Sequence, residues 1–326
     1  MIIKMAHGSG GKETEELVRN VFMQRFADER LRRMEDAAVI EIAGKAAFTT
    51  DSFVVTPLFF KGGDIGRLAV CGTVNDLLMM GAVPKYLSAG FIIEEGMDIA
   101  TLERVAASMA ETAAEAGVSI VAGDTKVIEG SGGLYINTAG IGTIPADRNV
   151  SPIRCEVGDA ILLSGNLGDH HACILSARMN IENSIQSDAA PLNTLVQTLF
   201  EHNVDVKAMR DVTRGGLATV LNELCGASAT GALIEENRIP VAEQTAAFCA
   251  ILGLDPLYMG NEGKFAAVVA AKDAENALSA LQATAGGEDA AIIGHIRPER
   301  GLAIKTRLGG TRVLGPLYGE GLPRIC

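Results

Sequence analysis

The chain has 326 residues, with 28 Lys and Arg against 40 Asp and Glu, and a formal net charge of −12. This acidic balance argues against a nucleic-acid partner, because phosphate backbones need a basic surface, but a nucleotide whose charge Mg²⁺ carries stays compatible. Apolar runs fall short of the ~18 residues that span a bilayer. The first residues lack a signal-peptide pattern, so we expect a cytoplasmic protein with no membrane partner.

The first half of the chain predicts alternating helices and strands. Apolar residues at helical spacing predict helices over 14–26, 65–80 and 98–116. Short apolar runs predict strands over 37–42, 46–50, 87–93, 118–122 and 134–144, the first two joined by a hairpin turn at Gly44-Lys45. Residues 147–152 read as a linker, after which the pattern starts again.

The second half has the same mixed style. Strands are predicted over 160–164, 230–235, 264–270 and 290–296, and helices over 169–179, 192–202, 216–225, 241–252 and 274–285. Together the halves predict an α+β protein of two α/β domains, 1–149 and 150–308. Residues 309–326 carry five glycines and two prolines, which favours a flexible tail.

The position of the last of the six cysteines sets it apart. No two of them form a CxxC pair, so in a reducing compartment the first five are expected to be core residues. Cys326 ends the chain, where a core role is not expected. It lies too close to the end for prenylation. A terminal thiol on a flexible tail could carry a chemical group, although composition also allows an accidental last residue.

The segment 7–12, His-Gly-Ser-Gly-Gly-Lys, opens the first predicted helix. Backbone N–H groups at Gly8, Gly10 and Gly11 could cradle a phosphate, and Lys12 adds positive charge. The segment lacks the ending of a Walker A motif, and no strand precedes it as a Rossmann fingerprint requires. A flexible N-terminal loop is at least as compatible with this pattern.

Four aspartates could hold a metal ion. Asp36, Asp51 and Asp124 stand at the ends of predicted strands, and Asp76 lies within the apolar helix 65–80. A carboxylate on such a helix needs a partner, and Mg²⁺ between phosphates is a suitable one. Each aspartate taken alone also fits a turn or a helix cap.

Two further polar segments could carry chemistry. Asp211-Val-Thr-Arg-Gly-Gly precedes a predicted helix, which places Thr213 and Arg214 in an anion-binding arrangement; an ordinary N-cap is an equal alternative. In the segment 261–264, Glu262 could act as a general base beside Lys264, or the segment could be a polar turn. Lys126 could contact a phosphate or move a proton, or be a solvated lysine.

The pair His170-His171, with Cys173 nearby, superficially resembles a metal cluster. Adjacent histidines at a helix start point in different directions, and no second cluster would complete four ligands. Asp169 as the N-cap of the helix 169–179 explains the segment without a metal.

These segments together resemble the HypE family of [NiFe]-hydrogenase maturation factors. The match runs in order along the whole chain, and its most specific part is the ending Pro-Arg-Ile-Cys, which relatives with the same nucleotide site lack. A small departure is Lys61, where relatives often have proline. The matching segments are 7–12, 35–39, 50–53, 62–66, 74–77, 123–127, 211–216, 260–264 and 323–326.

The resemblance implies a fold. The wider superfamily resembles aminoimidazole ribonucleotide synthetase, with selenophosphate synthetase and thiamine-monophosphate kinase as more distant relatives. It implies two α/β domains, the first of which contributes strands to a β-barrel in a homodimer. It also implies ATP and Mg²⁺ in a cleft between the domains, near the dimer interface.

The resemblance also implies an activity, carbamoyl dehydratase. The carbamoyltransferase HypF supplies a carbamoyl group to the terminal cysteine, and ATP drives dehydration of the S-carboxamide to an S-cyanide. The cyano group then passes to iron on the HypC–HypD complex, for the [NiFe]-hydrogenase centre.

The matching positions take roles from the family. Cys326 would carry the substrate, and Lys126 and Glu262 would manage protons during dehydration. The Mg²⁺–ATP ligands would be Asp51, Asp76 and Asp124. Nucleotide contacts would come from Gly8, Gly10, Gly11, Lys12, Asp36, Thr213 and Arg214.

Two alternatives remain open at this point. The first is a selenophosphate synthetase, which would need a reactive Cys or selenocysteine in the N-terminal glycine-rich loop, where this chain has Ser9 and no Cys. The second is a nucleotide-binding scaffold without catalysis that docks partners through its tail.

Overall fold

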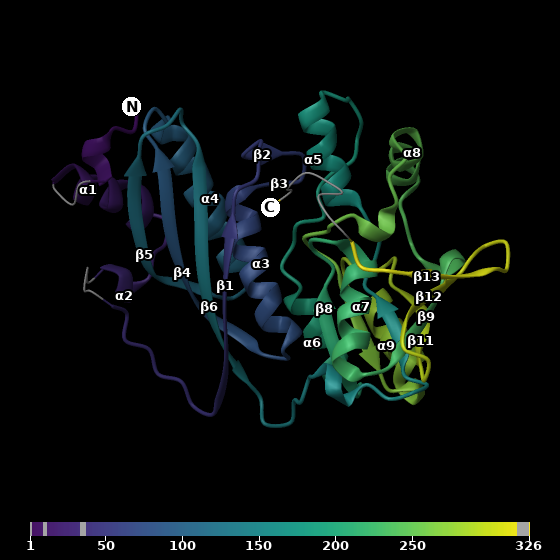
Figure 1. The fold of residues 1–326 in the computed structure, drawn as a ribbon. Coiled ribbons are helices and arrows are strands. Elements are labelled where there is room, and N and C mark those ends of the chain that lie inside the picture. The colour runs from purple at the N-terminus through teal and green to yellow at the C-terminus, as the bar shows by residue number, and fades with distance from the viewer. Residues whose placement is uncertain (1, 9–11, 33–36, 318–325) are drawn as a thin grey trace.

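The computed structural model describes residues 2–8, 12–32, 37–317 and 326. Two α/β halves lie side by side, and the C-terminus lies between them (Figure 1). The two halves and the mixed α+β content confirm the coarse fold prediction. Among the described residues, no helix is both long and apolar enough to cross a membrane.

Four described strands of the first half form one sheet, in the order β1-β6-β4-β5. β4 and β5 are parallel, and the other pairs are antiparallel. Helices α3 and α4 pack on one face of this sheet. Their bounds are β1 Lys45–Phe53, β4 Val83–Glu94, β5 Ser119–Ile128, β6 Leu134–Ile144, α3 Ile65–Met79 and α4 Ile99–Glu115.

Short elements complete the first half. The predicted helix 14–26 is present as α1 followed by one π-helical stretch, η2, which packs Phe22 against Phe91 of β4 with ring centroids 4.4 Å apart. The bounds are η1 Met5–Gly8, α1 Lys12–Leu17, η2 Val18–Met23, α2 Glu29–Arg32, β2 Phe59–Phe60 and β3 Gly63–Asp64.

Seven described strands of the second half form another sheet, in the order β13-β12-β9-β11-β7-β10-β8. They are β7 Ala160–Leu163, β8 Val206–Asp211, β9 Gly231–Glu235, β10 Phe265–Val269, β11 Ala291–Arg297, β12 Gly301–Lys305 and β13 Thr311–Leu314. The helical elements are η3 Pro152–Arg154, α5 Asp169–Met179, α6 Asn193–Glu201, α7 Gly216–Ser228, η4 Glu236–Arg238, α8 Glu243–Leu252, η5 Pro256–Tyr258, η6 Ala271–Asp273 and α9 Ala274–Gln282.

Both faces of the second sheet are covered. Leu162 of β7 belongs to the core shared with α6 and α9, whereas Ile161 and Leu163 belong to a separate core beneath α7. Alternate side chains of a strand point to opposite faces, so a strand buried on both faces reads as a continuous apolar run. This is why the run 160–164 could be recognised in the sequence.

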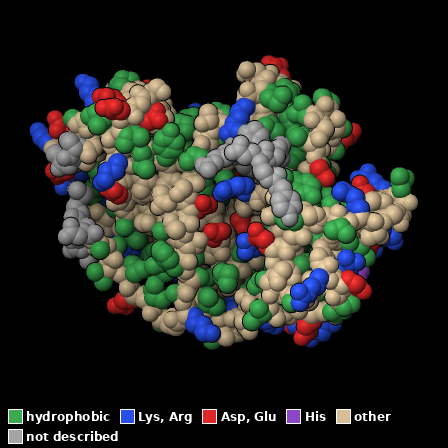
Figure 2. Space-filling view, viewed as in Figure 1, with side chains coloured by type: hydrophobic (Ala, Val, Ile, Leu, Met, Phe, Trp, Pro, Cys, Tyr) green, Lys and Arg blue, Asp and Glu red, His purple; other side chains and the backbone are tan. Residues whose placement is uncertain are grey.

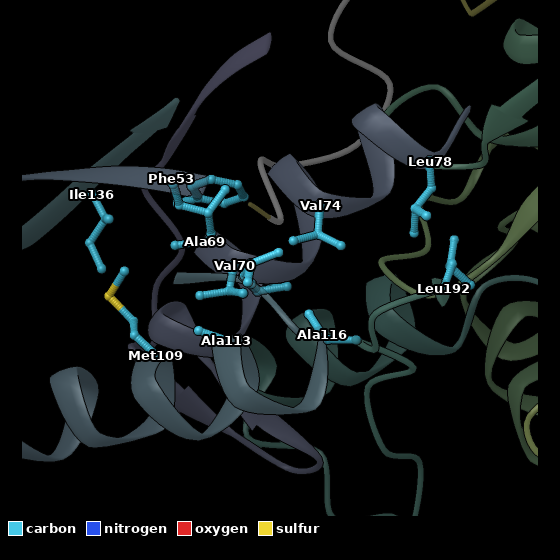
Figure 3. Packing of buried hydrophobic residues seen from close by; sticks show 14 of the residues in the cluster. Phe53, Ala69, Val70, Val74, Leu78, Met109, Ala113, Ala116, Ile136 and Leu192 are labelled. Atoms are coloured by element: carbon cyan, nitrogen blue, oxygen red, sulfur yellow. The ribbon is translucent and has the colours of Figure 1, made fainter. Parts of the chain in front are cut away.

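Helix α3 joins the two halves. It is buried on nearly all sides, with Phe53 and Ile136 of the first sheet on one side and Met109 and Ala113 of α4 on another (Figure 3). Its end packs toward the second half, where Leu78 faces Leu192 (Figure 3). The largest core cluster therefore runs through both halves.

Several sequence predictions are wrong. Residues 37–43 form no strand, and the predicted hairpin at Gly44-Lys45 is absent, because β1 pairs with the distant β6. Val39 is 77% exposed, so this apolar run has no sheet to pack on. The strands β8 and β12 were not predicted from the sequence.

The predicted tail needs correction, and the predicted barrel, which belongs to a homodimer, is not closed by the described part of one chain. β13 lies within the predicted tail 309–326 and pairs with β12, so the second sheet extends to Leu314. The rest of the tail is described only over 315–317 and at Cys326. Within the described residues, the sheet of the first half is open at β1 and β5, and no closed barrel is formed.

The packing of β1 on α3 predicts a stability effect. Phe53 is 1% exposed, and a Cβ on Gly72 would lie 2.8 Å from its ring. We expect Phe53→Ala to lower the free energy of unfolding by about 3–5 kcal/mol, measured by urea denaturation. Leu308→Ala, at a side chain that is 98% exposed, is the control and should change it by less than about 0.5 kcal/mol. Equal losses in the two variants would contradict this packing.

Candidate active site

A cleft of about 420 Å³ lies between the two halves. Acidic and basic side chains gather in the hollow between the halves, as Figure 2 shows. The first half contributes β1 and α3, and the second half contributes the end of β8, the following loop and α7. The polar lining residues are Thr49, Asp76, Ser151, Arg210, Asp211, Thr213, Arg214, Thr219 and Glu223.

Asp76 reaches this cleft from the otherwise apolar helix α3. Thr49 Oγ1 of β1 donates a hydrogen bond to Asp76 Oδ2 over 2.8 Å. Burial raises the pKa of Asp76, and the nearby Asp51 raises it further, against the opposing effects of Thr49 and Arg210. Burial likewise raises the pKa of Asp51, which lies within β1 rather than after it.

Asp211, at the end of β8, belongs to the same cluster of carboxylates. Burial, followed by the repulsion of Asp76 and Asp51, raises the pKa of Asp211 to about 7. The sequence analysis singled out the motif that Asp211 opens but gave the residue no metal-binding role. The signal was present, because an aspartate after a buried strand and before a glycine-rich helix start is typical of ligand-binding loops.

Glu262 lies on the loop between η5 and β10 and is 3% exposed. Burial raises its pKa well above the ordinary value, and Asp211, Asp188 and Asp51 add to this, whereas Arg214 opposes it. Its Oε1 atom accepts no hydrogen bond from the described residues. The raised pKa makes the carboxylate a stronger base than an ordinary glutamate, and its Oε1 atom is buried.

Cys326 lies close to Glu262, Arg214 and Asp51, and Arg214 is one of the residues that line the cleft. Burial, followed by the Glu262 carboxylate, raises the pKa of the Cys326 thiol to about 12, although Arg214 opposes this both by its charge and by a hydrogen bond. The side chain is partly buried and packs against the main core. By contrast, the other five cysteines are buried core residues, as the sequence predicted.

The loop before α7 is suited to anions. Gly215 adopts a left-handed conformation with φ of +84° and caps the helix, so Thr213 and Arg214 stand at its N-terminus. A Cβ on Gly216 would lie 2.5 Å from the carbonyl oxygen of Leu257, so only glycine fits this close approach. The free N–H groups of a helix start attract phosphate.

The carboxylates of the cleft fit Mg²⁺ in their chemistry. Asp51, Asp76 and Asp211 supply oxygen atoms whose mutual repulsion a divalent cation would relieve. They do not form a ready-made cage, since no group of three or more such ligands among the described residues could hold a metal ion. This arrangement is compatible with Mg²⁺ because the ion is usually held by one or two carboxylates together with substrate phosphates.

The other predicted site residues lie elsewhere in the chain. Asp124 and Lys126 are exposed on β5 and form an ion pair of 2.9 Å with each other. β5 and β1 are opposite edges of one sheet, three inter-strand steps or about 14 Å apart. A single chain therefore does not bring Asp124 to Asp51 and Asp76, or Lys126 to Glu262.

Gly8 of the glycine-rich segment lies against β5. Gly8 packs so closely on Val127 that a Cβ would lie 2.5 Å from the Val127 backbone nitrogen. Lys12 is exposed and pairs with Glu16 at 3.6 Å. The remaining nucleotide candidates, Gly10, Gly11 and Asp36, lie outside the described residues.

The helix α5 differs in detail from its prediction. Its N-cap is Gly168 rather than Asp169, and Asp169 instead accepts a hydrogen bond of 2.5 Å from Thr245. Burial lowers the pKa of His171 to about 4.

Lys264 lies 3.9 Å from Asp188 in an ion pair, so its carboxylate partner among the described residues is Asp188 rather than Glu262.

Comparison with known families defines the class of this chain. A family model described as AIR synthase related protein, N-terminal domain, matches residues 34–144, and the model of the corresponding C-terminal domain matches residues 156–307. These matches coincide with the two halves of the structure, so the chain is a two-domain protein of the AIR synthase related class.

Longer similarities identify the family. The carbamoyl dehydratase HypE of Cupriavidus necator is 46% identical, over 99% of this chain and 95% of the relative. A crystal structure of hydrogenase maturation protein HypE in complex with ATP superposes with a TM-score of 0.95 at 46% identity, covering 99% of both chains. A chain of a HypE–HypF complex matches with a TM-score of 0.81 at 45% identity, covering 92% of this chain and 99% of that one. The present chain belongs to the HypE family of carbamoyl dehydratases.

The raised pKa of Asp211 predicts a pH dependence of stability. With a pKa of about 7 instead of 3.8, the folded chain keeps a proton that the unfolded chain releases near pH 4. The stability that this carboxyl group contributes is therefore full below about pH 4 and is lost as the pH rises through about 7.

Asp211→Asn removes this loss. Relative to the wild type, its free energy of unfolding should rise between about pH 5 and about pH 8, by roughly 2–3 kcal/mol. Urea denaturation without metal or nucleotide measures the difference at both pH values. A difference that stays the same at the two values would show that Asp211 is not the titrating group.

Proposed function

We propose that this chain uses ATP to dehydrate an S-carboxamide on Cys326 to an S-cyanide, the cyano group being destined for the iron of [NiFe]-hydrogenase. The observation that supports this most directly is the position of the terminal thiol, close to Glu262 and Arg214. A chain end would otherwise be expected at the surface. Family membership and the ATP complex of a similar HypE support the same activity.

The proposed reaction balances. The carboxamide oxygen attacks the γ-phosphorus of ATP and ADP leaves, which turns a poor leaving group into phosphate. Loss of phosphate and of both N–H protons then leaves the carbon–nitrogen triple bond on sulfur. The products are the S-cyanide, ADP, phosphate and one released proton, the second amide proton being carried by the phosphate.

Glu262 is the proposed base for an amide proton. Its raised pKa makes the carboxylate a stronger base than an ordinary glutamate, and the group lies close enough to Cys326 to act on the pKa of the thiol. Attachment of the substrate to Cys326 makes the proton transfer intramolecular, which raises the effective concentration of the reacting groups. The thiol itself stays protonated until it is carbamoylated, because its pKa is raised.

The phosphate groups would be held from the second half of the chain. Thr213 and Arg214 stand at the N-terminus of α7 and line the cleft. Mg²⁺, bound by Asp51 and Asp76, would supply charge neutralisation at the phosphates. Asp211 joins this proposed ligand set on the basis of its position.

A homodimer would complete the site. Phe48, Ile92 and Tyr135 lie on the face of the first sheet that α3 and α4 leave uncovered, and they are 69%, 43% and 36% exposed. Packing this face against a second copy would bury the apolar surface in a closed barrel. It is also the face that carries Asp124 and Lys126, so a second copy would place them near the cleft, together with Gly8, which packs on Val127 of the same strand.

The proposed partners follow from the family. A structure of a HypE–HypF complex supports HypF as the source of the carbamoyl group, and the HypC–HypD complex would receive the cyano group. The function takes place in the cytoplasm. The proposed domains are an ATP-binding domain, 1–149, and a second domain, 150–308. The tail, 309–326, carries the thiol, and its first residues extend the second sheet.

Mass spectrometry of the C-terminal peptide tests the reaction. With HypF, carbamoyl phosphate and ATP, wild-type Cys326 should gain one carboxamide group and then lose one water. Glu262→Gln should accumulate the carboxamide, with dehydration slowed by about 10²–10⁴-fold, and Cys326→Ala should gain neither group.

The exposed Glu299→Gln serves as the matched control and should react like the wild type. A non-catalytic scaffold predicts that no ATP-dependent loss of water occurs in any of these proteins. Modification of Cys326→Ala at another residue would show that the terminal thiol is not the carrier.

The dimer is tested by a charge on the uncovered sheet face. Phe48→Glu should weaken self-association by about 10-fold or more, because each dimer would bury two unpaired carboxylates. Light scattering after size-exclusion chromatography measures the molecular mass across a dilution series. Ile251→Glu, at an 82% exposed position of α8, should leave the mass unchanged. A Phe48→Glu protein with wild-type mass at every concentration would refute this interface.

A further inference from the structure

The segment 183–192, here called the strap, connects α5 to α6 without forming a helix or strand. It lies against the first half of the chain. Ser187 N donates to Lys61 O over 2.8 Å, and Arg67 Nε donates to Ala189 O over 2.7 Å. Lys61 Nζ also donates to the carbonyl oxygen of Asn183. The strap is therefore tied to the first domain although it belongs to the second.

The other side of the strap holds the backbone of Glu262. Glu262 N donates to Asp188 Oδ1 over 3.1 Å, and Glu262 O accepts from Ala190 N over 3.4 Å. A Cβ on Gly263 would overlap with the carbonyl oxygen of Asp188, so the two segments are in direct contact. Both backbone polar groups of the proposed base are thus bonded to one short segment.

Asn75 of α3 connects this arrangement to the first domain. Its Oδ1 accepts from Leu192 N over 2.9 Å, and its Nδ2 donates to Ala190 O over 3.1 Å and to Glu262 O at 3.5 Å. The side chain is 2% exposed. One residue of the first domain therefore contacts both the strap and the loop of Glu262, next in sequence to Asp76.

The carboxylate of Asp188 is buried with few polar partners. Its side chain is 5% exposed, and its ion pair with Lys264 is long, at 3.9 Å. Its Oδ2 atom accepts no hydrogen bond from the described residues. Burying a carboxylate with so little compensation is unfavourable, and such groups gather where function requires them.

We propose that Asp188 and Asn75 are positioning residues that fix Glu262 against the thiol of Cys326. They thereby make dehydration depend on the contact between the two domains. The inference rests on the proposed function, since it takes Glu262 as the base. Neither residue is assigned a contact with the reacting atoms, so both act through the backbone of Glu262.

This role predicts that loss of Asp188 slows dehydration but not nucleotide binding or carbamoylation. A displacement of about 1 Å at a catalytic group can cost about 10²-fold in rate. We expect Asp188→Ala to slow the loss of water from the Cys326 carboxamide by about 10-fold or more. Nucleotide affinity and carbamoylation by HypF should stay within about 2-fold of wild type, because other groups serve those steps.

The experiment is a single-turnover assay on full-length protein carbamoylated by HypF. Mass spectrometry of the C-terminal peptide follows dehydration after ATP is added, and ATP affinity and thermal midpoint are measured on the same samples. Asp188→Asn keeps an acceptor for the Glu262 N–H group and should restore most of the rate.

The matched control is Asp159→Ala. Asp159 is likewise a buried aspartate that accepts a backbone hydrogen bond, from Glu156 N over 2.7 Å, but it lies just before β7 and does not contact the loop of Glu262. The Asp159→Ala variant therefore removes a comparable buried carboxylate without touching the loop of Glu262. We expect a lowered thermal midpoint and a wild-type dehydration rate.

A double-mutant cycle tests whether the two residues act together. Asn75→Ala alone should also slow dehydration, and the double variant with Asp188→Ala should be no slower than the slower single variant, because both hold the same loop. Additive effects would refute a shared role.

Two outcomes would overturn the inference. Asp188→Ala could dehydrate at the wild-type rate, or all of its steps could weaken in parallel with its stability, as for a purely structural residue. Failure of the proposed function looks different, since the wild-type protein itself would then lose no water from Cys326.

Discussion

The burial of helix α3 is the constraint on which the site depends. The helix is enclosed by the first sheet, by α4 and by the second domain, so it cannot shift without disturbing three packed interfaces. Its polar residues are therefore held where the packing places them. Asp76 is directed into the cleft and Asn75 into the domain contact, and the two are adjacent on this largely apolar helix.

The electrostatics of the cleft follow from this packing. Asp51, Asp76 and Asp211 are buried close together, and each raises the pKa of at least one of the others or of Glu262. A cluster of this kind repels a free nucleotide and attracts a cation–nucleotide complex. Burial, followed by the same negative field, raises the pKa of the Cys326 thiol, so the chain end lies beside these carboxylates without adding another charge.

The predicted site residues fall into two separate groups, which supports the proposed homodimer. Cys326 and Glu262 lie close to the cleft that Arg214 and Asp76 line, whereas Asp124 and Lys126 lie on the far edge of the first sheet. The sheet also leaves one face uncovered and apolar. A second copy on this face would bury the exposed apolar side chains. It would also bring Asp124 and Lys126 to a cleft.

The sequence by itself determined most elements with strong periodicity, the two-domain arrangement, the family and the motifs around Asp51, Asp76, Thr213 and Glu262. Helical spacing and motif order are local properties, so they can be read without a fold. Only the tertiary structure decided that 37–43 forms no strand, that β13 extends the second sheet, and that Asp124 lies apart from Asp51. It also showed that Asp188 and Asn75 hold Glu262. These results depend on pairing and burial between residues far apart in the chain, which no local pattern records.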